Sequence, residues 1–145
     1  QGLVWEQGYR SGALRGPLFG DVPAALRRWS SAGLQLAVYS SGSVTAQQLI
    51  YGYSNAGDLR PLFSGWFDTR SGPKQEAASY LNIANQLGVP AEQVLFISDA
   101  KAECQAAAST GMQVIFSCRK GNPEQNSGKF EQISSFDELE LSALA

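Results

Sequence analysis

The chain contains no histidine, and its 145 residues include only two cysteines, Cys104 and Cys118. Without histidine these residues cannot form a Ser-His-Asp or Cys-His catalytic site, and the absence also argues against a zinc site. The two cysteines do not have C-x-x-C spacing, so we interpret them as buried or incidental thiols of a reducing compartment. We therefore expect a cytoplasmic protein.

Strong charge and long apolar runs are also missing. The formal net charge is -2 and no basic stripe is present, which argues against a nucleic-acid partner. No apolar run approaches the roughly 18 residues of a membrane span, so we expect no membrane partner. Residues 1–6 do not have the basic and apolar regions of a signal peptide. The sole methionine is Met112, and we expect that the chain begins inside a longer protein.

What is present is an ordinary globular composition, with 43% apolar and 17% charged residues. We expect residues 1–145 to form a single domain, because a chain of this length can bury one core. Helix and strand patterns alternate along it. Helices are expected over residues 3–16, 21–33, 43–51, 58–62, 74–87, 100–109 and 136–141, and strands over 34–39, 65–68, 94–97, 113–116 and near 132–133. This alternation predicts an α/β fold with a parallel sheet and helices on both faces.

A serine-rich turn follows the first expected strand, at the end of a parallel strand where ligands bind in such sheets. Amide groups at a helix start favour an anion, Gly42 lets the backbone approach a ligand, and the hydroxyls of Ser40 and Ser41 can donate to phosphate. The alternative is a strand-to-helix turn with Ser43 as the helix cap. This alternative is favoured when the turn is taken alone.

Lys74 is expected to open the helix over residues 74–87. A lysine is more favourable at a helix C-terminus, so one at the N-terminus needs a compensating anion, which a phosphate group would supply. The alternative is a lysine whose side chain extends into water.

Asp99 directly follows the apolar run 94–97. A carboxylate at the carboxyl end of a strand is a suitable oxygen ligand for magnesium. Glu103 lies four residues along the expected helix and could orient either a metal-bound water or a lysine. The alternative is that Asp99 only caps the helix that starts at Ala100.

The order of these segments resembles the haloacid-dehalogenase phosphohydrolase superfamily. Within it, the chain is similar to the acireductone synthase family, the bifunctional enolase-phosphatases of methionine salvage. The segments that carry the resemblance are VYSSGS (38–43), AQ (46–47), GDL (57–59), GWFDT (65–69), GPK (72–74), SY (79–80), FISD (96–99) and GNP (121–123). It extends from residues 2–5 to residues 136–139, which is nearly the whole chain.

The resemblance implies a Rossmann-type three-layer core and a magnesium-dependent reaction on a small phosphorylated substrate. Family members enolise 2,3-diketo-5-methylthiopentyl 1-phosphate and remove its phosphate through an aspartate nucleophile, which gives an acireductone. By position, Ser40 and Ser41 would hold the substrate, Lys74 would neutralise phosphate charge, and Asp99 would bind magnesium. We expect these side chains to converge on one edge of the sheet.

The chain departs from the family at its first motif, where an aspartate nucleophile should follow an N-terminal strand. None of the aspartates has that setting; they are Asp21, Asp58, Asp68, Asp99 and Asp137. We therefore expect a C-terminal portion of the enzyme that lacks the first, central strand, with residues 1–15 as the trailing end of a cap region. Tyr53 replaces a frequent histidine and Lys120 a frequent proline, and we assign neither a role.

A sheet without its central strand exposes backbone hydrogen-bonding groups on two edges. We expect that the chain is either unstable alone or completed by strand pairing with another chain or with the missing N-terminal part. We also expect no phosphatase turnover from residues 1–145 alone, because covalent phosphoryl transfer requires the absent carboxylate.

Two other functions remain as alternatives. A non-catalytic interaction or pseudoenzyme fragment would use the exposed edges to bind a partner. A nucleotide-binding α/β domain would need a Gly-x-Gly-x-x-Gly or Gly-x-x-x-x-Gly-Lys turn after a strand, which this sequence does not have.

Overall fold

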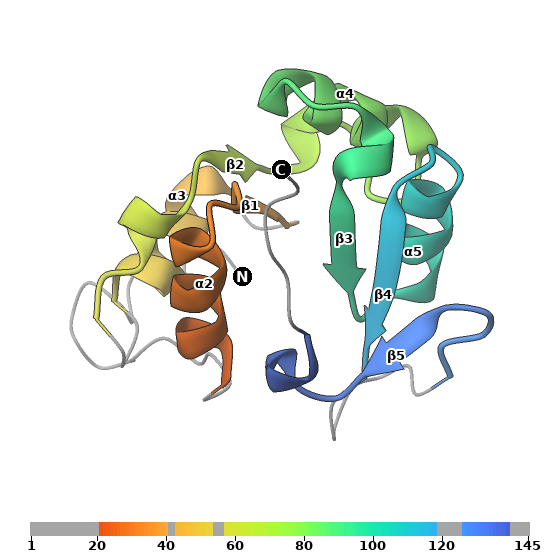
Figure 1. Ribbon diagram of the computed structural model, residues 1–145. Coiled ribbons are helices and arrows are strands. Elements are labelled where there is room, and N and C mark those ends of the chain that lie inside the picture. Colours follow the sequence, from red (N-terminus) through yellow and green to blue (C-terminus); the bar gives the residue numbers. More distant parts are fainter. Residues whose placement is uncertain (1–20, 41–42, 54–56, 119–125, 140–145) are drawn as a thin grey trace. The chain divides into compact units, whose positions relative to one another are not determined.

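The computed structural model describes residues 21–40, 43–53, 57–118 and 126–139 (Figure 1). The helices and strands, in chain order, are α2 (Asp21–Ser31), β1 (Ala37–Tyr39), α3 (Val44–Gly52), β2 (Gly65–Phe67), α4 (Ala77–Leu87), β3 (Leu95–Ser98), α5 (Lys101–Ala108), β4 (Gln113–Ser117) and β5 (Glu131–Ile133). Single 3₁₀ turns are η1 (Arg60–Leu62), η2 (Thr69–Ser71), η3 (Ala91–Gln93) and η4 (Phe136–Glu138). The alternation of helices with parallel strands confirms the expected α/β class.

Contacts divide the chain into two compact units, residues 1–69 with 139–145, and residues 70–138. We describe each unit by itself. The expectation of a single domain over residues 1–145 stays a prediction.

In the first unit, α2 forms where the sequence predicts it. Asp21 places a negative charge in its first turn and Pro23 occupies that turn, both of which suit a helix N-terminus. One face of the helix is buried, through Val22, Pro23, Ala25, Leu26 and Trp29. The expected helix over residues 3–16 lies outside the described residues.

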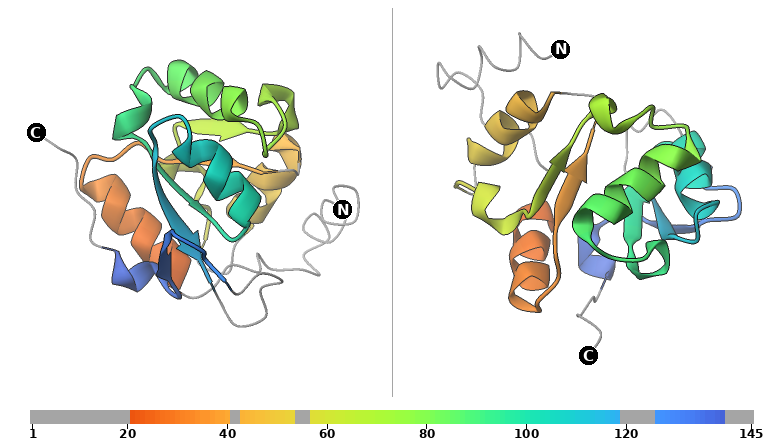
Figure 2. Two further views of the ribbon diagram at one scale, coloured as in Figure 1. Left: turned by 90° about the vertical axis from the view of Figure 1, so that its right-hand side faces the viewer. Right: turned by 90° about the horizontal axis from the view of Figure 1, so that it is seen from above.

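The strands β1 and β2 of this unit pair in parallel, with Ala37 opposite Gly65 and Tyr39 opposite Phe67 (Figure 2). β1 is shorter than the run 34–39 predicts, and its residues are exposed or only partly buried. Among the described residues β1 pairs with β2 alone. A strand with one neighbour has fewer residues packed around it, which explains why the apolar run is not fully buried.

The second unit is a parallel sheet in the order β3-β4-β5, with Phe96 opposite Val114 and Phe116 opposite Gln132. Helix α5 packs against β3 and β4 and also contacts α4 (Figure 2). Its small residues allow close approach to the sheet, and Phe116 packs there with Cys104 and Cys118. Both cysteines are buried free thiols, as the sequence predicted.

Helix α4 begins later than the sequence predicts, and side-chain hydrogen bonds fix the turn before it. The helix starts at Ala77 rather than Lys74. Within its first turn, the Ser79 hydroxyl donates to the Pro73 carbonyl at 2.7 Å, and the Tyr80 hydroxyl donates to the Lys74 carbonyl at 2.6 Å. Because these carbonyls bind side-chain hydroxyls, residues 73–76 form a turn instead of another helical turn.

Two further expected helices are single 3₁₀ turns. The segment 58–62 forms η1, where the Asp58 carboxylate accepts from the Arg60 amide and guanidinium. Hydrogen bonds from Arg60 lower the pKa of the Asp58 carboxyl to about 2. The segment 136–141 forms η4, whose Glu138 carboxylate accepts from the Ser134 and Ser135 amides. Residues 140–141 lie outside the described residues.

Each sheet ends in a strand that precedes candidate site residues, β1 in the first unit and β3 in the second. In the part of the chain that the structure describes, no strand pairs with β1 opposite β2, and none pairs with β3 opposite β4. An unpaired edge leaves amide and carbonyl groups able to bind another strand. Over the same residues, no helix has the length and apolar character needed to cross a membrane.

We predict that replacing Gly72 with alanine destabilises the chain more than replacing Gly88. Both glycines have positive φ, at 127° and 75°, but a Cβ at Gly88 meets no atom within 4 Å whereas a Cβ at Gly72 overlaps the Ser79 hydroxyl. Gly88→Ala should lower the free energy of unfolding by about 1 kcal/mol. Gly72→Ala should lower it by about 2 kcal/mol or more. Urea denaturation of the two variants checks this, and an equal or smaller loss for Gly72→Ala contradicts it.

Candidate functional site

The candidate site residues are divided between the two units. Ser40 belongs to the first unit, whereas Lys74, Asp99 and Glu103 belong to the second. Ser41 lies outside the described residues. The expectation that the serines, the lysine and the aspartate converge on one edge therefore stays a prediction, and we build the two parts separately.

In the first unit, the serine turn starts where β1 ends. The Ser40 amide donates to the Phe67 carbonyl in β2 at 3.2 Å, which places the turn beside the end of that strand. Ser43 is the N-cap of α3, and its hydroxyl accepts from the Ala46 amide at 3.1 Å. The capping role considered for Ser43 is therefore confirmed.

Asp68 also holds this turn, a role that was not predicted from the sequence. Its carboxylate is buried, with 6% of the residue exposed, and accepts from the Val44 amide at 3.3 Å. A second contact joins α3 to the end of β2, where the Gln47 side-chain amide donates to the Phe67 carbonyl at 2.6 Å. The sequence feature that could have identified Asp68 is its position directly after the short strand β2, which runs parallel to β1.

These contacts correct one expectation about the helix start. The amides of Val44 and Ala46 are not available to an anion. The Val44 amide already donates to the Asp68 carboxylate, and the Ala46 amide donates to the Ser43 hydroxyl. A phosphate at this turn would depend on the serine hydroxyls more than on the helix amides. It would also lie near a carboxylate, so the turn alone is a poor anion site.

In the second unit, Lys74 lies in the turn before α4 and its ammonium group is paired. Its Nζ is 3.0 Å from Glu103 Oε1, and only 17% of the lysine side chain and 11% of the glutamate side chain are exposed. The expected anion for Lys74 is therefore present as a carboxylate of this chain. The alternative in which the lysine extends into water is wrong.

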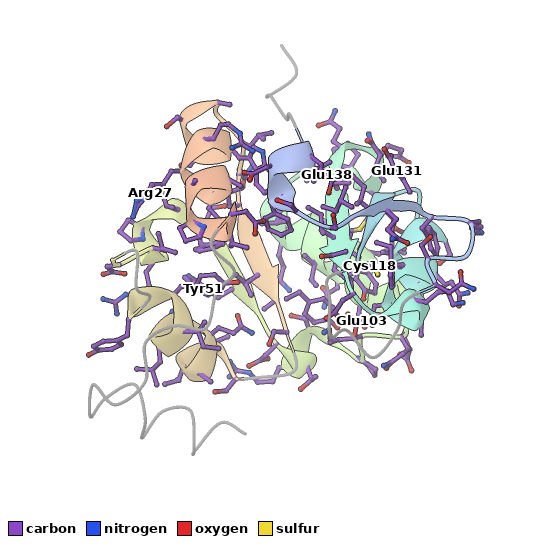
Figure 3. All side chains as sticks on the ribbon, turned by 90° about the horizontal axis from the view of Figure 1, so that it is seen from below. Arg27, Tyr51, Glu103, Cys118, Glu131 and Glu138 are labelled. Atoms are coloured by element: carbon purple, nitrogen blue, oxygen red, sulfur yellow. The ribbon has the colours of Figure 1, made fainter. Side chains whose placement is uncertain are left out.

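Ser98, the last residue of β3, connects this pair to the sheet. Its hydroxyl donates to Glu103 Oε1 at 3.0 Å and accepts from the Ala100 amide at 3.1 Å. Figure 3 labels Glu103, which projects from the first turn of α5. Of the two roles considered for Glu103, the geometry favours the one in which it orients the lysine.

Asp99 follows Ser98 and is exposed. Helix α5 has Ala100 at its N-cap and no side-chain capping bond, so the capping alternative for Asp99 is wrong. Over residues 21–40, 43–53, 57–118 and 126–139, no group of three or more His, Cys, Asp or Glu could hold a metal ion. Asp99 can thus offer one carboxylate, and the other metal ligands would have to come from elsewhere.

The end of β3 brings these groups together. The ammonium of Lys74 and the hydroxyl of Ser98 share one oxygen of Glu103, and Asp99 is the next residue along the chain. An ammonium and an exposed carboxylate beside a strand end can bind a phosphate group and a cation. Within the second unit, Lys74 and Glu103 are thus in contact beside the end of β3, and the binding roles expected for Lys74 and Asp99 stay predictions.

Comparison with known proteins is consistent with this geometry. A family model described as a haloacid dehalogenase-like hydrolase matches residues 3–111. The enolase-phosphatase E1 of Synechococcus elongatus is 58% identical over 139 residues, which are 96% of this chain and 58% of that protein. Enolase-phosphatase E1 of Azotobacter vinelandii is 51% identical over 99% of this chain and 62% of its own length. That of Aquifex aeolicus is 48% identical over 97% of this chain and 62% of its own length.

The chain thus spans about three fifths of the curated relatives it matches. Among solved structures, the UTR4 protein of Saccharomyces cerevisiae is 36% identical, with a TM-score of 0.83 over 95% of this chain and 64% of that one. CbbY from Rhodobacter sphaeroides, at 19% identity and a TM-score of 0.77 over 93% and 62%, shows the same fold. The resemblance drawn from the sequence segments is confirmed, and the chain belongs to the haloacid dehalogenase-like hydrolase family.

Proposed function

We propose that the chain is part of a magnesium-dependent enolase-phosphatase. It acts on 2,3-diketo-5-methylthiopentyl 1-phosphate and gives an acireductone in methionine salvage, in the cytoplasm. The observation that carries the proposal is the paired Lys74 ammonium beside the Ser98–Asp99 strand end. Relatives named enolase-phosphatase E1 at 48–58% identity support the reaction.

The charges of this strand end support a divalent cation. Lys74 and Glu103 form a pair, and Asp99 adds a further carboxylate. These three groups together repel a phosphate dianion rather than attract it. Magnesium, when bound, would reverse this charge and act as a Lewis acid toward the phosphate oxygens.

The residues of this chain then have separate tasks. Asp99 would be one magnesium ligand, and its exposure leaves room for water and substrate oxygens as the others. The Lys74 ammonium would bind the phosphate and stabilise charge in the transition state. Ser40 and Ser41 would hold the substrate through their hydroxyls. Glu103 would not be a metal ligand, because its Oε1 is already bound to Lys74 and Ser98.

We further propose that turnover needs the part of the relatives that this chain does not span. No aspartate of the chain has the setting of the family's nucleophile, and covalent phosphoryl transfer requires one. The edges of β1 and β3 support the same proposal, since each can accept a strand from that part or from another chain. These edges are also what favours the second candidate, a non-catalytic fragment that binds a partner strand.

We predict that substitutions at Asp99 and Lys74 stop or slow phosphate release. The protein for this test is the chain joined to the part of the Synechococcus elongatus relative that it does not span, referred to below as the joined protein. Asp99→Asn should abolish magnesium-dependent phosphate release. Lys74→Met should lower kcat by about 100-fold, or about 3 kcal/mol, as expected for a lost electrostatic stabiliser.

Asp137→Asn is the matched control, because Asp137 is exposed and lies on η4 in the same unit. It should leave the rate unchanged. Phosphate release is followed with the diketo phosphate over a series of magnesium concentrations. Full activity of the Asp99 or Lys74 variant would show that the role given to that residue is wrong.

We predict that the 145-residue chain alone releases no phosphate from the same substrate at any magnesium concentration. The reason is chemical, because the chain provides a phosphate site without a nucleophile. A coupled phosphate assay on the purified chain checks this. Magnesium-dependent release that Asp99→Asn removes would refute it, whereas release that survives Asp99→Asn would indicate a contaminating phosphatase.

A further inference from the structure

We propose that Tyr80 is a positioning residue for Lys74, and that it acts through the lysine main chain. Tyr80 lies on α4, is 1% exposed, and donates its hydroxyl to the Lys74 carbonyl at 2.6 Å. The whole lysine side chain separates the bound carbonyl from the ammonium group that would meet phosphate, so Tyr80 is not one of the binding groups described above. The inference rests on the role proposed for Lys74.

The turn that carries Lys74 has little regular structure to hold it. Helix α4 begins at Ala77, so the Lys74 carbonyl precedes the helical hydrogen-bond ladder. Side chains of the helix replace that ladder, with Ser79 bound to the Pro73 carbonyl and Tyr80 bound to the Lys74 carbonyl. The Tyr80 hydroxyl is therefore a main anchor of the lysine backbone.

Tyr80 is itself fixed to the strand that ends at the site. Its ring packs edge-to-face on Phe96 of β3, with centroids 4.9 Å apart and an interplanar angle of 71°. Two residues further along β3, the Ser98 hydroxyl binds Glu103, which holds the lysine ammonium. Contacts thus run from β3 through Tyr80 to the lysine backbone, and back through Glu103 to β3.

This closed ring of contacts restrains both ends of a flexible side chain. An ion pair alone would fix the ammonium while the backbone moved, and a lysine side chain has many rotamers to lose. With the backbone bound by Tyr80 and the ammonium by Glu103, the position of Lys74 is defined relative to the end of β3. Pre-positioned charge is the form in which a cation stabilises a transition state.

A double-mutant cycle in the joined protein tests the inference. Tyr80→Phe removes only the hydroxyl and keeps the ring on Phe96, and it should lower kcat about tenfold with a smaller change in KM. In a Lys74→Met background the same substitution should cause no further loss, because Tyr80 acts through the lysine. Tyr53→Phe, at a tyrosine that is 44% exposed, is the control and should leave kcat unchanged.

Equal losses in both backgrounds, or no loss in either, would overturn the inference.

If Lys74→Met keeps full activity, the role proposed for Lys74 fails instead, and a second measurement on the 145-residue chain decides about Tyr80. Nitrogen-15 NMR can observe the ammonium group of an ion-paired lysine, and Lys74→Met identifies its signal. The Lys74 signal should weaken in Tyr80→Phe and in Glu103→Gln but not in Tyr53→Phe. An unchanged Lys74 signal in Tyr80→Phe would refute the positioning role.

Ser98 provides an independent variant from the other side of the ring. Ser98→Ala removes the bond to Glu103, whereas Ser98→Thr keeps a hydroxyl in that place. The alanine variant should lower kcat and weaken the Lys74 signal, and the threonine variant should restore both. If Ser98→Ala leaves both unchanged, the closed ring does not hold the lysine.

Discussion

The ion pair between Lys74 and Glu103 is the contact on which the site of the second unit depends. Both side chains are more than four-fifths buried, and a charge removed from water to that degree needs a partner. Removing either partner would leave the other charge uncompensated. The pair therefore ties the turn before α4 to the first turn of α5, and both to the end of β3. It also explains why a lysine can occupy this position before any phosphate is bound.

The same pair sets the electrostatic conditions for an anionic ligand. Because Glu103 already balances Lys74, an arriving phosphate meets a site whose remaining charge is the carboxylate of Asp99. The serine turn of the first unit, taken by itself, also carries a carboxylate, because Asp68 accepts from the Val44 amide at the start of α3. Binding of a phosphate ester to either part is unfavourable without a cation. The charges of the described residues thus favour the cation that the proposed function includes.

Much of the fold could be predicted from the sequence, because apolar runs and turn residues report local structure. Helix α2, strand β4 and the cap at Ser43 were predicted within a few residues. The start of α4 was not, because the competing hydrogen bonds come from Ser79 and Tyr80, and their acceptors are not visible in a periodic pattern. Asp68 was missed for the same reason, since its partner belongs to a helix more than twenty residues earlier.

β1 and β3, the strands that precede the candidate site residues, are less buried than the sequence predicts. β1 and the first three residues of β3 are apolar and suited to a strand with neighbours on both sides, yet each strand pairs on one side only within the described residues. Their composition fits an interior position in a sheet, whereas their pairing is that of an edge. A strand added to either edge would satisfy both the backbone groups and the apolar side chains. If it ran parallel to β1 or β3, it would also end beside Ser40 or Asp99, where the proposed function calls for a further carboxylate.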